Sequence, residues 1–543
     1  MTKYIFVTGG VASSVGKGIT VASLGAILKS KGLSVSVQKM DPYLNVDPGT
    51  MSPYQHGEVF VTKDGAETDL DLGNYERFID IELTAASSVT SGKIYSRLIA
   101  KERKGEYLGG TIQVVPHLVN EIKGCFCQLA EESQADVVIV EVGGTVGDIE
   151  GQPFLEAIRQ MRKDAGRENV CYIHVTLLPH IGPTGELKTK PTQHSVGELR
   201  RIGIQPDVIV LRADRAIPEE IRDKVALFCD VEKEAVIFMP TAPSIYDVPL
   251  VLEKEGMGQL VGKILNIQLN KTDVTKWQKI TDNINNLKGQ VNIALVGKYV
   301  ELQDAYYSVR EALSHAAIEN GTGLNIIWVQ SQDLEKEGGE RLLEKAQGII
   351  VPGGFGDRGI EGKIAAAKYA REHNIPYLGL CLGMQIMVIE FARYVLDTKD
   401  CTSTEFNICT AHPVIDILET QKEIGDKGGT MRLGNYPCLI KEGTQAKKAY
   451  GCCQITERHR HRFEFNNRYS NLLEENGLLI SGISPDGSLA EICEIKHHPF
   501  MVACQFHPEF LSRPGRPHPL FNSFIQASQE VVLAGSQTKM PLE

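Results

Sequence analysis

The chain contains 543 residues, of which 42% are hydrophobic and 23% charged, so it is too long for one compact core and we expect two globular domains. Its formal net charge of -11 argues against a general nucleic-acid surface, because such a surface needs basic side chains to displace phosphate counterions. The first ten residues lack the features of a secretion signal, and no apolar run is long enough to cross a bilayer, so we expect a cytoplasmic protein without a membrane partner.

Two series of short β-branched runs alternate with amphipathic helical stretches, which predicts strand-helix-strand units on mostly parallel sheets. The first series has predicted strands at 5–8, 35–39, 137–142, 170–177 and 208–211, and the second at 291–296, 325–329, 348–351 and 376–380. We therefore predict the α/β fold class, with a P-loop-type first domain at 1–266, a polar linker at 267–290, a second α/β domain at 291–532 and a flexible tail at 533–543.

A glycine-rich loop, GGVASSVGKG at residues 9–18, follows the first predicted strand and opens a helix. Glycines let backbone N–H groups face an anion, the helix N-terminus adds positive potential, and Lys17 supplies a cation for the β- and γ-phosphates. Gly18 stands where Ser or Thr usually holds magnesium, so we expect Mg²⁺ to use other ligands, with Asp71 and Glu141 as candidates. The alternative is a glycine-rich turn with helix-capping carboxylates.

A second motif, GLCLG at residues 379–383, joins an apolar strand to a helix and has the small residues of a nucleophile elbow. Among twelve cysteines, most of which we expect to be inert reduced thiols, only Cys381 has such surroundings. The base is predicted as His507 in QFHPE at 505–509, oriented by Glu509, and GGFG at 353–356 offers N–H groups to an oxyanion together with that of Leu382. A lone cysteine is more often structural, but the three motifs together favour a Cys-His-Glu triad.

These motifs, in this order, resemble the class I glutamine amidotransferases, and with the unusual phosphate loop the chain resembles the CTP synthase family over essentially its whole length. The distinctive strings are KMDPY at 39–43, DPGTM at 47–51, HGEV at 56–59, DLGNYER at 71–77 and GGTVGDIE at 143–150. The resemblance implies an amidoligase (synthetase) domain that binds ATP and UTP, followed by a flavodoxin-like glutamine amidotransferase domain.

For the first domain, the resemblance implies that Lys17 and Lys39 stabilise the transferring phosphoryl group and that Asp71 and Glu141 hold Mg²⁺. It assigns ATP to Ser14, Val15, Gly16, Lys17, Gly18, Ile19 and Asp71. It assigns UTP, and CTP as inhibitor, to Ser13, Asp148, Ile149, Glu150, Lys188, Thr189, Lys190, Pro191, Thr192, Gln193 and Lys224. From the residues alone, Lys188 and Lys190 are better explained as a solvated charge pair.

For the second domain, the resemblance assigns substrate glutamine to Gly354, Leu382, Gly383, Met384, Gln385, Glu405 and Arg462. The run ERHRHR at 457–462 has two histidines that suggest a metal site, but its arginines would repel a cation, so an anion-facing strand is favoured. The run GTMRLG at 429–434 is similar to the family's lid, where GTP activates glutamine hydrolysis.

The implied reaction is amination of UTP to CTP, with ATP activating the pyrimidine and glutamine supplying ammonia. The resemblance further implies Mg²⁺ and ATP as cofactors, GTP as activator, CTP as inhibitor, His56 as an ammonia gate, and a homotetramer that in some members stacks into filaments. Two alternatives remain: another ATP-dependent amidotransferase, such as those amidating cobyrinic acid, and a P-loop switch carrying an inactive glutaminase-like module.

Overall fold

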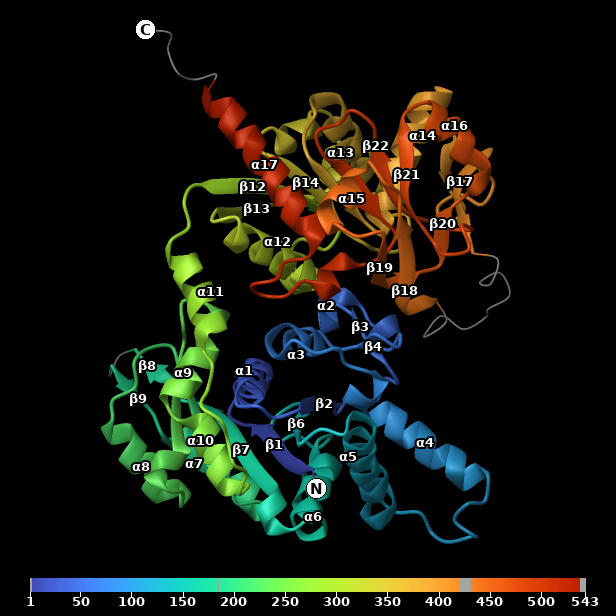
Figure 1. The fold of residues 1–543 in the computed structure, drawn as a ribbon. Coiled ribbons are helices and arrows are strands. Elements are labelled where there is room, and N and C mark those ends of the chain that lie inside the picture. The colour runs from blue at the N-terminus through green and yellow to red at the C-terminus, as the bar shows by residue number, and fades with distance from the viewer. Residues whose placement is uncertain (1, 183–184, 419–430, 538–543) are drawn as a thin grey trace. The chain divides into compact units, whose positions relative to one another are not determined.

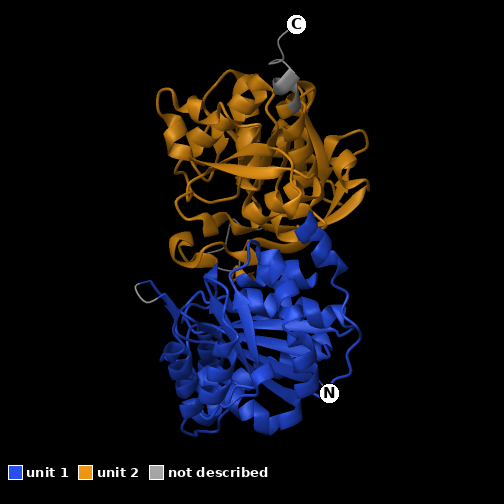
Figure 2. Cartoon of the chain, turned by 90° about the vertical axis from the view of Figure 1, so that its left-hand side faces the viewer, with its two compact units in different colours: residues 1–48, 71–282 blue, residues 49–70, 283–543 orange. Residues whose placement is uncertain are grey.

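The structure is a computed structural model that describes residues 2–182, 185–418 and 431–537. The chain forms two compact units, each built from two stretches of sequence (Figure 2). Unit 1 comprises Met1–Pro48 and Asp71–Asp282, and unit 2 comprises Gly49–Leu70 and Asn283–Glu543. Within the described part of the chain, no helix is both long and apolar enough to span a bilayer.

Unit 1 is built on a seven-stranded sheet in which all neighbouring strands are parallel (Figure 1). The strand order is β11-β10-β7-β1-β6-β2-β5. The central strands are buried on both sides because their runs are mainly apolar and rich in β-branched residues, as in parallel sheets covered by helices. The strand bounds are β1 Lys3–Gly9, β2 Val35–Asp41, β5 Ser88–Thr90, β6 Val137–Val142, β7 Val170–Leu177, β10 Val208–Ala213 and β11 Val236–Pro240.

Helices cover both faces of the unit 1 sheet. Phe6 and Val140 pack in one core with Phe126 of α5 and Phe154 of α6, and Ile139 on the opposite face lies beside α1. A small hairpin joins β8 (His180–Ile181) and β9 (Glu186–Leu187). The helix bounds are α1 Lys17–Ser30, α3 Asp71–Ile79, α4 Ser91–Arg103, α5 Val119–Ser133, α6 Gln152–Asp164, α7 Lys190–Arg201, α8 Glu220–Cys229, α9 Val248–Lys254, α10 Met257–Ile264 and α11 Thr275–Asn285.

Unit 2 contains a nine-stranded mixed sheet in the order β13-β12-β14-β15-β23-β22-β21-β18-β19. Its first five strands are parallel and have the 2-1-3-4-5 order of flavodoxin-like folds, whereas the remaining pairs are antiparallel. The bounds are β12 Gln290–Gly297, β13 Gly323–Gln330, β14 Gly348–Val351, β15 Tyr377–Leu380, β18 Arg432–Ile440, β19 Gln454–His461, β21 Leu478–Ile483, β22 Ala490–Ile495 and β23 Met501–Cys504.

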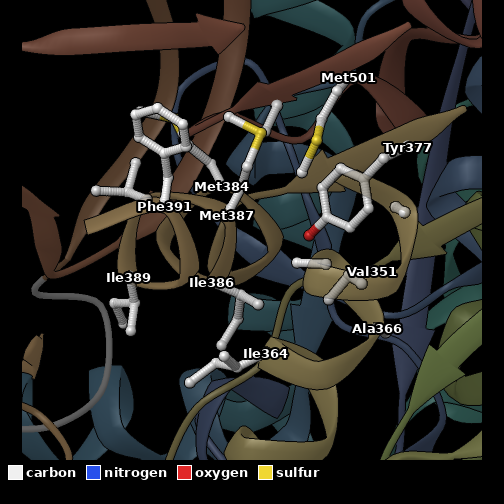
Figure 3. Close-up of a cluster of buried hydrophobic side chains, with 14 of the residues drawn as sticks. Val351, Ile364, Ala366, Tyr377, Met384, Ile386, Met387, Ile389, Phe391 and Met501 are labelled. Atoms are coloured by element: carbon white, nitrogen blue, oxygen red, sulfur yellow. The ribbon is translucent and has the colours of Figure 1, made fainter. Parts of the chain in front are cut away.

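Two apolar cores form on this second sheet. One contains Tyr377, Met384, Met387 and Met501 and packs α13 and α14 against the strands (Figure 3). The other joins α12 and α17 to the sheet. The helix bounds are α2 Pro53–His56, α12 Tyr307–Glu319, α13 Ile360–His373, α14 Leu382–Leu396, α15 Gln445–Tyr450, α16 Ser470–Glu475 and α17 Pro519–Gln537. The smaller strands are β3 Phe60–Val61, β4 Glu67–Thr68, β16 Cys401–Ser403, β17 His412–Ile417 and β20 Phe463–Phe465.

The architecture confirms the predicted α/β class. The bounds of the two compact units differ from the predicted domain boundaries. Residues 49–70 were expected in the first domain, but they belong to unit 2. Residues 267–282, the start of the expected linker, belong to unit 1, because α11 is not wholly polar: Trp277 and Ile280 are buried, and Trp277 packs against Phe78 with ring centroids 5.1 Å apart. The expected tail begins inside α17, and residues 538–543 lie outside the described residues.

Candidate active site

Cys381 sits at a sharp turn between β15 and α14. Its backbone φ of 50° and ψ of -100° is an uncommon conformation for a residue other than glycine, as in strained nucleophile elbows. Small neighbours are required: a Cβ at Gly383 would lie 2.1 Å from the Val351 carbonyl oxygen. The backbone N–H of Cys381 donates to the Cys504 carbonyl at 2.7 Å, which ties the turn to β23.

The predicted base and its orienting carboxylate lie directly after β23. His507 Nδ1 and Glu509 Oε1 are 2.7 Å apart, and both side chains are buried. Burial acts to lower the pKa of His507, but Glu509 and Cys381 outweigh it and raise the pKa to about 10. The raised pKa favours the protonated form of His507 at neutral pH, and a protonated imidazole is the kind of neighbour that activates cysteine nucleophiles.

The glycines of the 353–356 loop allow this loop to approach the triad. A Cβ at Gly353 would lie 2.8 Å from His507 Cε1 and 3.6 Å from Cys381 Cβ, so only glycine fits there. Glu405 accepts a hydrogen bond from the Gly356 N–H at 2.7 Å, and burial raises the pKa of its carboxyl group. The structure thus joins one predicted glutamine-binding carboxylate to the predicted oxyanion loop.

A cavity of about 270 Å³ opens beside the triad. It is several times the roughly 30 Å³ that one water occupies in liquid, so it can admit a small substrate. Residues that follow β12, β14, β15 and β23 line it, at the carboxyl ends of the parallel strands, where ligands of open α/β sheets bind. The lining includes Tyr299, Gly353, Gly354, Phe355, Cys381, Arg460, His507 and Glu509, together with Gly49, Met51, Pro53, Gly57, Glu58 and Val59.

The segment 49–70 thus forms part of this site, which the sequence pattern did not predict. Glu58 accepts hydrogen bonds from the backbone N–H and hydroxyl of Ser308, at 3.0 and 2.5 Å. Glu67 forms an ion pair with Arg460 at 2.7 Å, and the Arg460 carbonyl faces the Cys381 thiol at 3.7 Å. His56, expected as a gate, lies 3.4 Å from Asp69 within the same segment.

The second centre lies in unit 1, where the phosphate loop joins β1 to α1. Gly16 caps the helix with a positive φ of 94°, and the buried Lys17 donates from Nζ to the Gly144 carbonyl at 2.8 Å. Burial lowers the pKa of Lys17. The loop and the helix N-terminus therefore have the form predicted for phosphate binding.

Lys39 lies between the two predicted metal ligands. It pairs with Glu141 at 2.8 Å across neighbouring parallel strands and also with Asp71 at the start of α3. Tyr75 donates from its hydroxyl to Glu141 at 2.5 Å. Burial raises the pKa of Glu141; burial acts in the same direction on Asp71, but Lys39 and Lys17 outweigh it and lower that pKa.

The two carboxylates fit Mg²⁺, which proteins commonly hold through one or two carboxylates together with phosphate oxygens. Within the described ranges there is no cluster of three or more His, Cys, Asp or Glu side chains that could form a complete protein cage for a metal. The structure also explains Gly18: a Cβ there would lie 2.3 Å from Asp71 Oδ1. Asp71 occupies the space that a serine or threonine of a standard phosphate loop would need.

Two family models match the chain, CTP synthase N-terminus over residues 3–267 and Glutamine amidotransferase class-I over residues 301–527. A CTP synthase of Dehalococcoides mccartyi is 68% identical over 542 residues, which cover 100% of both chains. A CTP synthase of Chloroflexus aurantiacus is 65% identical over 542 residues, covering 100% of this chain and 99% of that protein. The chain belongs to the CTP synthase family. A solved glutaminase domain of Trypanosoma brucei CTPS with bound acivicin is 39% identical, with a TM-score of 0.42, and matches 44% of this chain and 94% of that chain.

Five of the nucleotide residues that the family resemblance assigned beyond the phosphate loop lie on α7 and α8 in unit 1, and Lys188 and Thr189 directly precede α7. Thr189 and Thr192 are buried, Lys190 lies 5.4 Å from the Phe228 ring, and Lys188 pairs with Glu186. Lys224 is exposed on α8. These contacts are compatible with a solvated pair as well as with a ligand site, so the UTP assignment stays a prediction.

The remaining assigned nucleotide residues border the strand ends of unit 1. Asp148 accepts from the Thr145 N–H and hydroxyl at 2.5 and 2.8 Å, which stabilises the turn before α6. Ile149 is 83% exposed, and Ser13, Ser14 and Glu150 are also exposed. Val15 is buried in the loop before α1. Ile19 in the first turn of α1 is half-buried, and so are Pro191 and Gln193 on α7. Their contacts with nucleotides remain predictions.

In unit 2 of this CTP synthase family member, Leu382, Gly383, Met384 and Gln385 are buried at the start of α14. Gln385 donates to the Phe463 carbonyl at 2.9 Å, and Arg462 is half-buried between β19 and β20. Of the expected lid at 429–434, residues 429 and 430 lie outside the described residues. Contacts of these side chains with glutamine, and of the lid with GTP, remain predictions.

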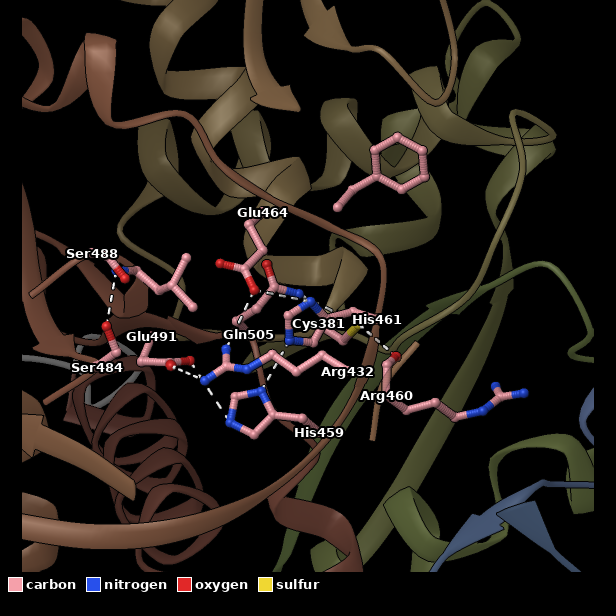
Figure 4. Close-up of polar contacts among 12 residues, drawn as sticks. Cys381, Arg432, His459, Arg460, His461, Glu464, Ser484, Ser488, Glu491 and Gln505 are labelled. Carbon is pink, nitrogen blue, oxygen red and sulfur yellow. Dashed lines mark hydrogen bonds and ion pairs between the residues drawn. The ribbon is translucent and has the colours of Figure 1, made fainter. Parts of the chain in front are cut away.

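The strand with two histidines forms a buried polar cluster next to Cys381 (Figure 4). His459 and His461 are 2.9 Å apart, and Arg432 pairs with Glu491 at 2.8 Å and Glu464 at 3.3 Å. Burial, with Arg432 adding to it, lowers the pKa of both histidines. Arg432 therefore lies between Glu464 and Glu491, where its positive charge would repel a metal cation.

Two polar neighbours of the triad were not predicted from the sequence. Gln505 Nε2 lies 3.6 Å from the Cys381 sulfur, and Lys363 of α13 is fully buried beside Gly354. Gln505 lies two residues before His507, on the same extended segment, which was an available signal. Lys363 interrupts the apolar face that Ile360, Ile364 and Ala367 form at helical spacing.

Proposed function

We propose that this chain catalyses the ATP-dependent amination of UTP to CTP, with ammonia taken from glutamine. The observation that carries the proposal is the pairing of His507 with Glu509 at 2.7 Å and the lining of one cavity by both residues and Cys381, in a chain that belongs to the CTP synthase family along its length. A free thiol is mostly protonated at neutral pH, so a cysteine nucleophile needs a neighbouring base of this kind.

In the glutaminase reaction, the Cys381 sulfur attacks the amide carbon of glutamine and forms a tetrahedral oxyanion. N–H groups of the 353–356 loop and of Leu382 bind the oxyanion. His507 gives its Nε2 proton to the departing ammonia, while Glu509 holds Nδ1 and so fixes the orientation of the ring. A thioester remains, and water activated by His507 hydrolyses it to glutamate.

In the synthetase reaction, the γ-phosphoryl group of ATP is transferred to O4 of UTP, ammonia attacks C4, and phosphate leaves. Lys17 and Lys39 stabilise charge on the transferring phosphoryl group. Asp71 and Glu141 would hold Mg²⁺, which neutralises phosphate charge when bound. Ser13, Lys188, Lys190 and Lys224 bind UTP in this proposal, as the family resemblance implies.

Regulation, assembly and location belong to the same proposal. GTP activates glutamine hydrolysis, CTP inhibits, and the protein forms a homotetramer in the cytoplasm, with filaments as a further assembly. Reduced thiols support this location, since all twelve cysteines are free.

The test measures CTP formed from UTP and ATP, with either glutamine or ammonia and with GTP varied. We expect glutamine-driven synthesis to fall by about 10,000-fold or more in Cys381→Ala, and ammonia-driven synthesis to persist. No CTP from the wild type with either nitrogen source would reject the proposal, and absence of UTP-dependent ATP hydrolysis would favour another amidotransferase. Survival of glutamine-driven synthesis in Cys381→Ala would show that another group is the nucleophile.

A further inference from the structure

Lys363 is a buried cation to which no step of the reaction assigns a role. It lies on α13, its side chain is fully buried, and its Nζ has no hydrogen-bond partner among the residues that the structure describes. Burying an unpaired ammonium group is unfavourable, because the group loses its hydration without gaining a partner. Such a group is therefore a candidate for a function that offsets its effect on stability.

The ammonium group faces the back of the oxyanion loop. A Cβ at Gly354 would lie 3.8 Å from Lys363 Nζ, whereas a Cβ at Gly353 would lie 3.6 Å from Cys381 Cβ and 2.8 Å from His507 Cε1. The two adjacent glycines therefore contact the triad on one side and Lys363 on the other. The side chains of Leu382 and Lys298 also lie beside Gly354, at 3.6 and 3.7 Å from the position of its Cβ.

The other charged groups around the loop have hydrogen-bond partners. Lys298 donates to the Phe355 carbonyl, Arg358 donates to the Lys298 carbonyl at 2.8 Å, and Glu405 accepts from Gly356. Burial lowers the pKa of Lys363 to about 7, Lys298 and Arg358 act in the same direction, and Cys381 and Glu405 oppose them. At neutral pH the Lys363 amine is therefore protonated in a substantial fraction of the molecules, and more fully at lower pH.

We propose that the protonated form of Lys363 is a positioning group for glutamine hydrolysis, which acts through the Gly353–Gly354 backbone to stabilise negative charge on the oxyanion and on the Cys381 sulfur. A preorganised positive charge in a buried site acts strongly because water does not screen it. The proposal rests on the proposed glutaminase function. If Lys363 only fills space, a neutral side chain of similar length should serve equally well.

The test compares Lys363→Met and Lys363→Gln with the wild type. We expect kcat/KM for glutamine hydrolysis to fall about tenfold in both variants, mainly through kcat, because the lost interaction is with charge that develops during the reaction. Alkylation of Cys381 by iodoacetamide, followed at its own peptide by mass spectrometry, should shift to higher pH. Ammonia-driven CTP synthesis should stay at the wild-type rate, and Tm should be equal or higher because an unpaired buried charge is gone.

Lys368→Met is the matched control, since Lys368 lies on the same helix with its side chain 57% exposed. It should leave the hydrolysis rate and the alkylation profile unchanged. Wild-type hydrolysis and alkylation in Lys363→Met, full activity in Lys363→Gln, or loss of folding in both variants would each overturn the proposal. A wild type that does not hydrolyse glutamine would instead reject the proposed function.

Discussion

The two candidate centres satisfy their charges in different ways. In unit 1, Lys39 pairs with both Asp71 and Glu141, and Lys17 donates to a carbonyl, so these cations are bound by the protein's own acceptors. In unit 2, Glu509 contacts Nδ1 of His507 and raises the pKa of its imidazole. The neighbouring Cys381 lines a cavity. The proposed nucleophile therefore has a neighbour with a raised pKa, whereas the proposed phosphate centre has cations and carboxylates that pair with one another.

Apart from loss of the nucleophile itself, the largest expected effect is that of Lys39→Met, which removes the cation that pairs with Asp71 and Glu141. We expect CTP synthesis from ammonia and from glutamine to fall about a thousandfold, because Lys39 is proposed to stabilise the transferring phosphoryl group. Glutamine hydrolysis, measured as glutamate released, should persist. The control is Lys104→Met at an exposed position. Equal losses of synthesis and hydrolysis would contradict the separation of the two centres.

A smaller effect is expected from Glu509→Gln, which tests the neighbour of the proposed nucleophile. Glu509 raises the pKa of His507, so removing its charge should lower that pKa from about 10 and move the alkaline limb of glutamine kcat/KM to lower pH. We expect about a hundredfold loss at pH 8 and unchanged ammonia-driven synthesis. Glu475→Gln, at an exposed site, is the control. An alkaline limb at the wild-type position would show that Glu509 does not set the charge of His507.

The smallest effect is expected from Gly18→Ala, which fills the space next to the Asp71 carboxylate. In Gly18→Ala the new Cβ would lie 2.3 Å from Asp71 Oδ1, so Asp71 must move, and we expect a stability loss of about 1–3 kcal/mol in denaturant unfolding. Ammonia-driven synthesis should also decrease. Gly124→Ala in the middle of α5 is the control, because nothing lies within 4 Å of its new Cβ and alanine favours helices. Equal stability changes in the two variants would show that Asp71 adapts freely.

Much of this organisation follows from local sequence. The strand-loop-helix context of Lys17 and the elbow around Cys381 are each contained in about ten neighbouring residues, so pattern and chemistry predict them together. His507 and Glu509 could be paired because they are two residues apart on a segment after an apolar strand. The parallel sheets follow from apolar β-branched runs at regular intervals.

Long-range partners could not be predicted from these patterns. Nothing local shows that Glu67 pairs with Arg460 or that Glu58 binds Ser308, because these contacts join positions hundreds of residues apart. Lys39 was expected at the phosphate, but its position between two carboxylates depends on the register of β2 with β6. The burial of Lys363 likewise depends on how α13 packs, which the sequence marks only by a lysine on an apolar face.

The insertion of residues 49–70 into unit 2 limits how the protein can be divided. A fragment starting at residue 283 would lack the partner of Arg460, the acceptor for Ser308, and Phe60, whose ring lies 4.9 Å from that of Phe510. Phe510 in turn stacks on His507, with ring centroids 5.2 Å apart. Exchanging glutaminase modules between related enzymes at a single junction would therefore separate the His507 imidazole from part of its support, so we expect a working chimera to need two crossover points.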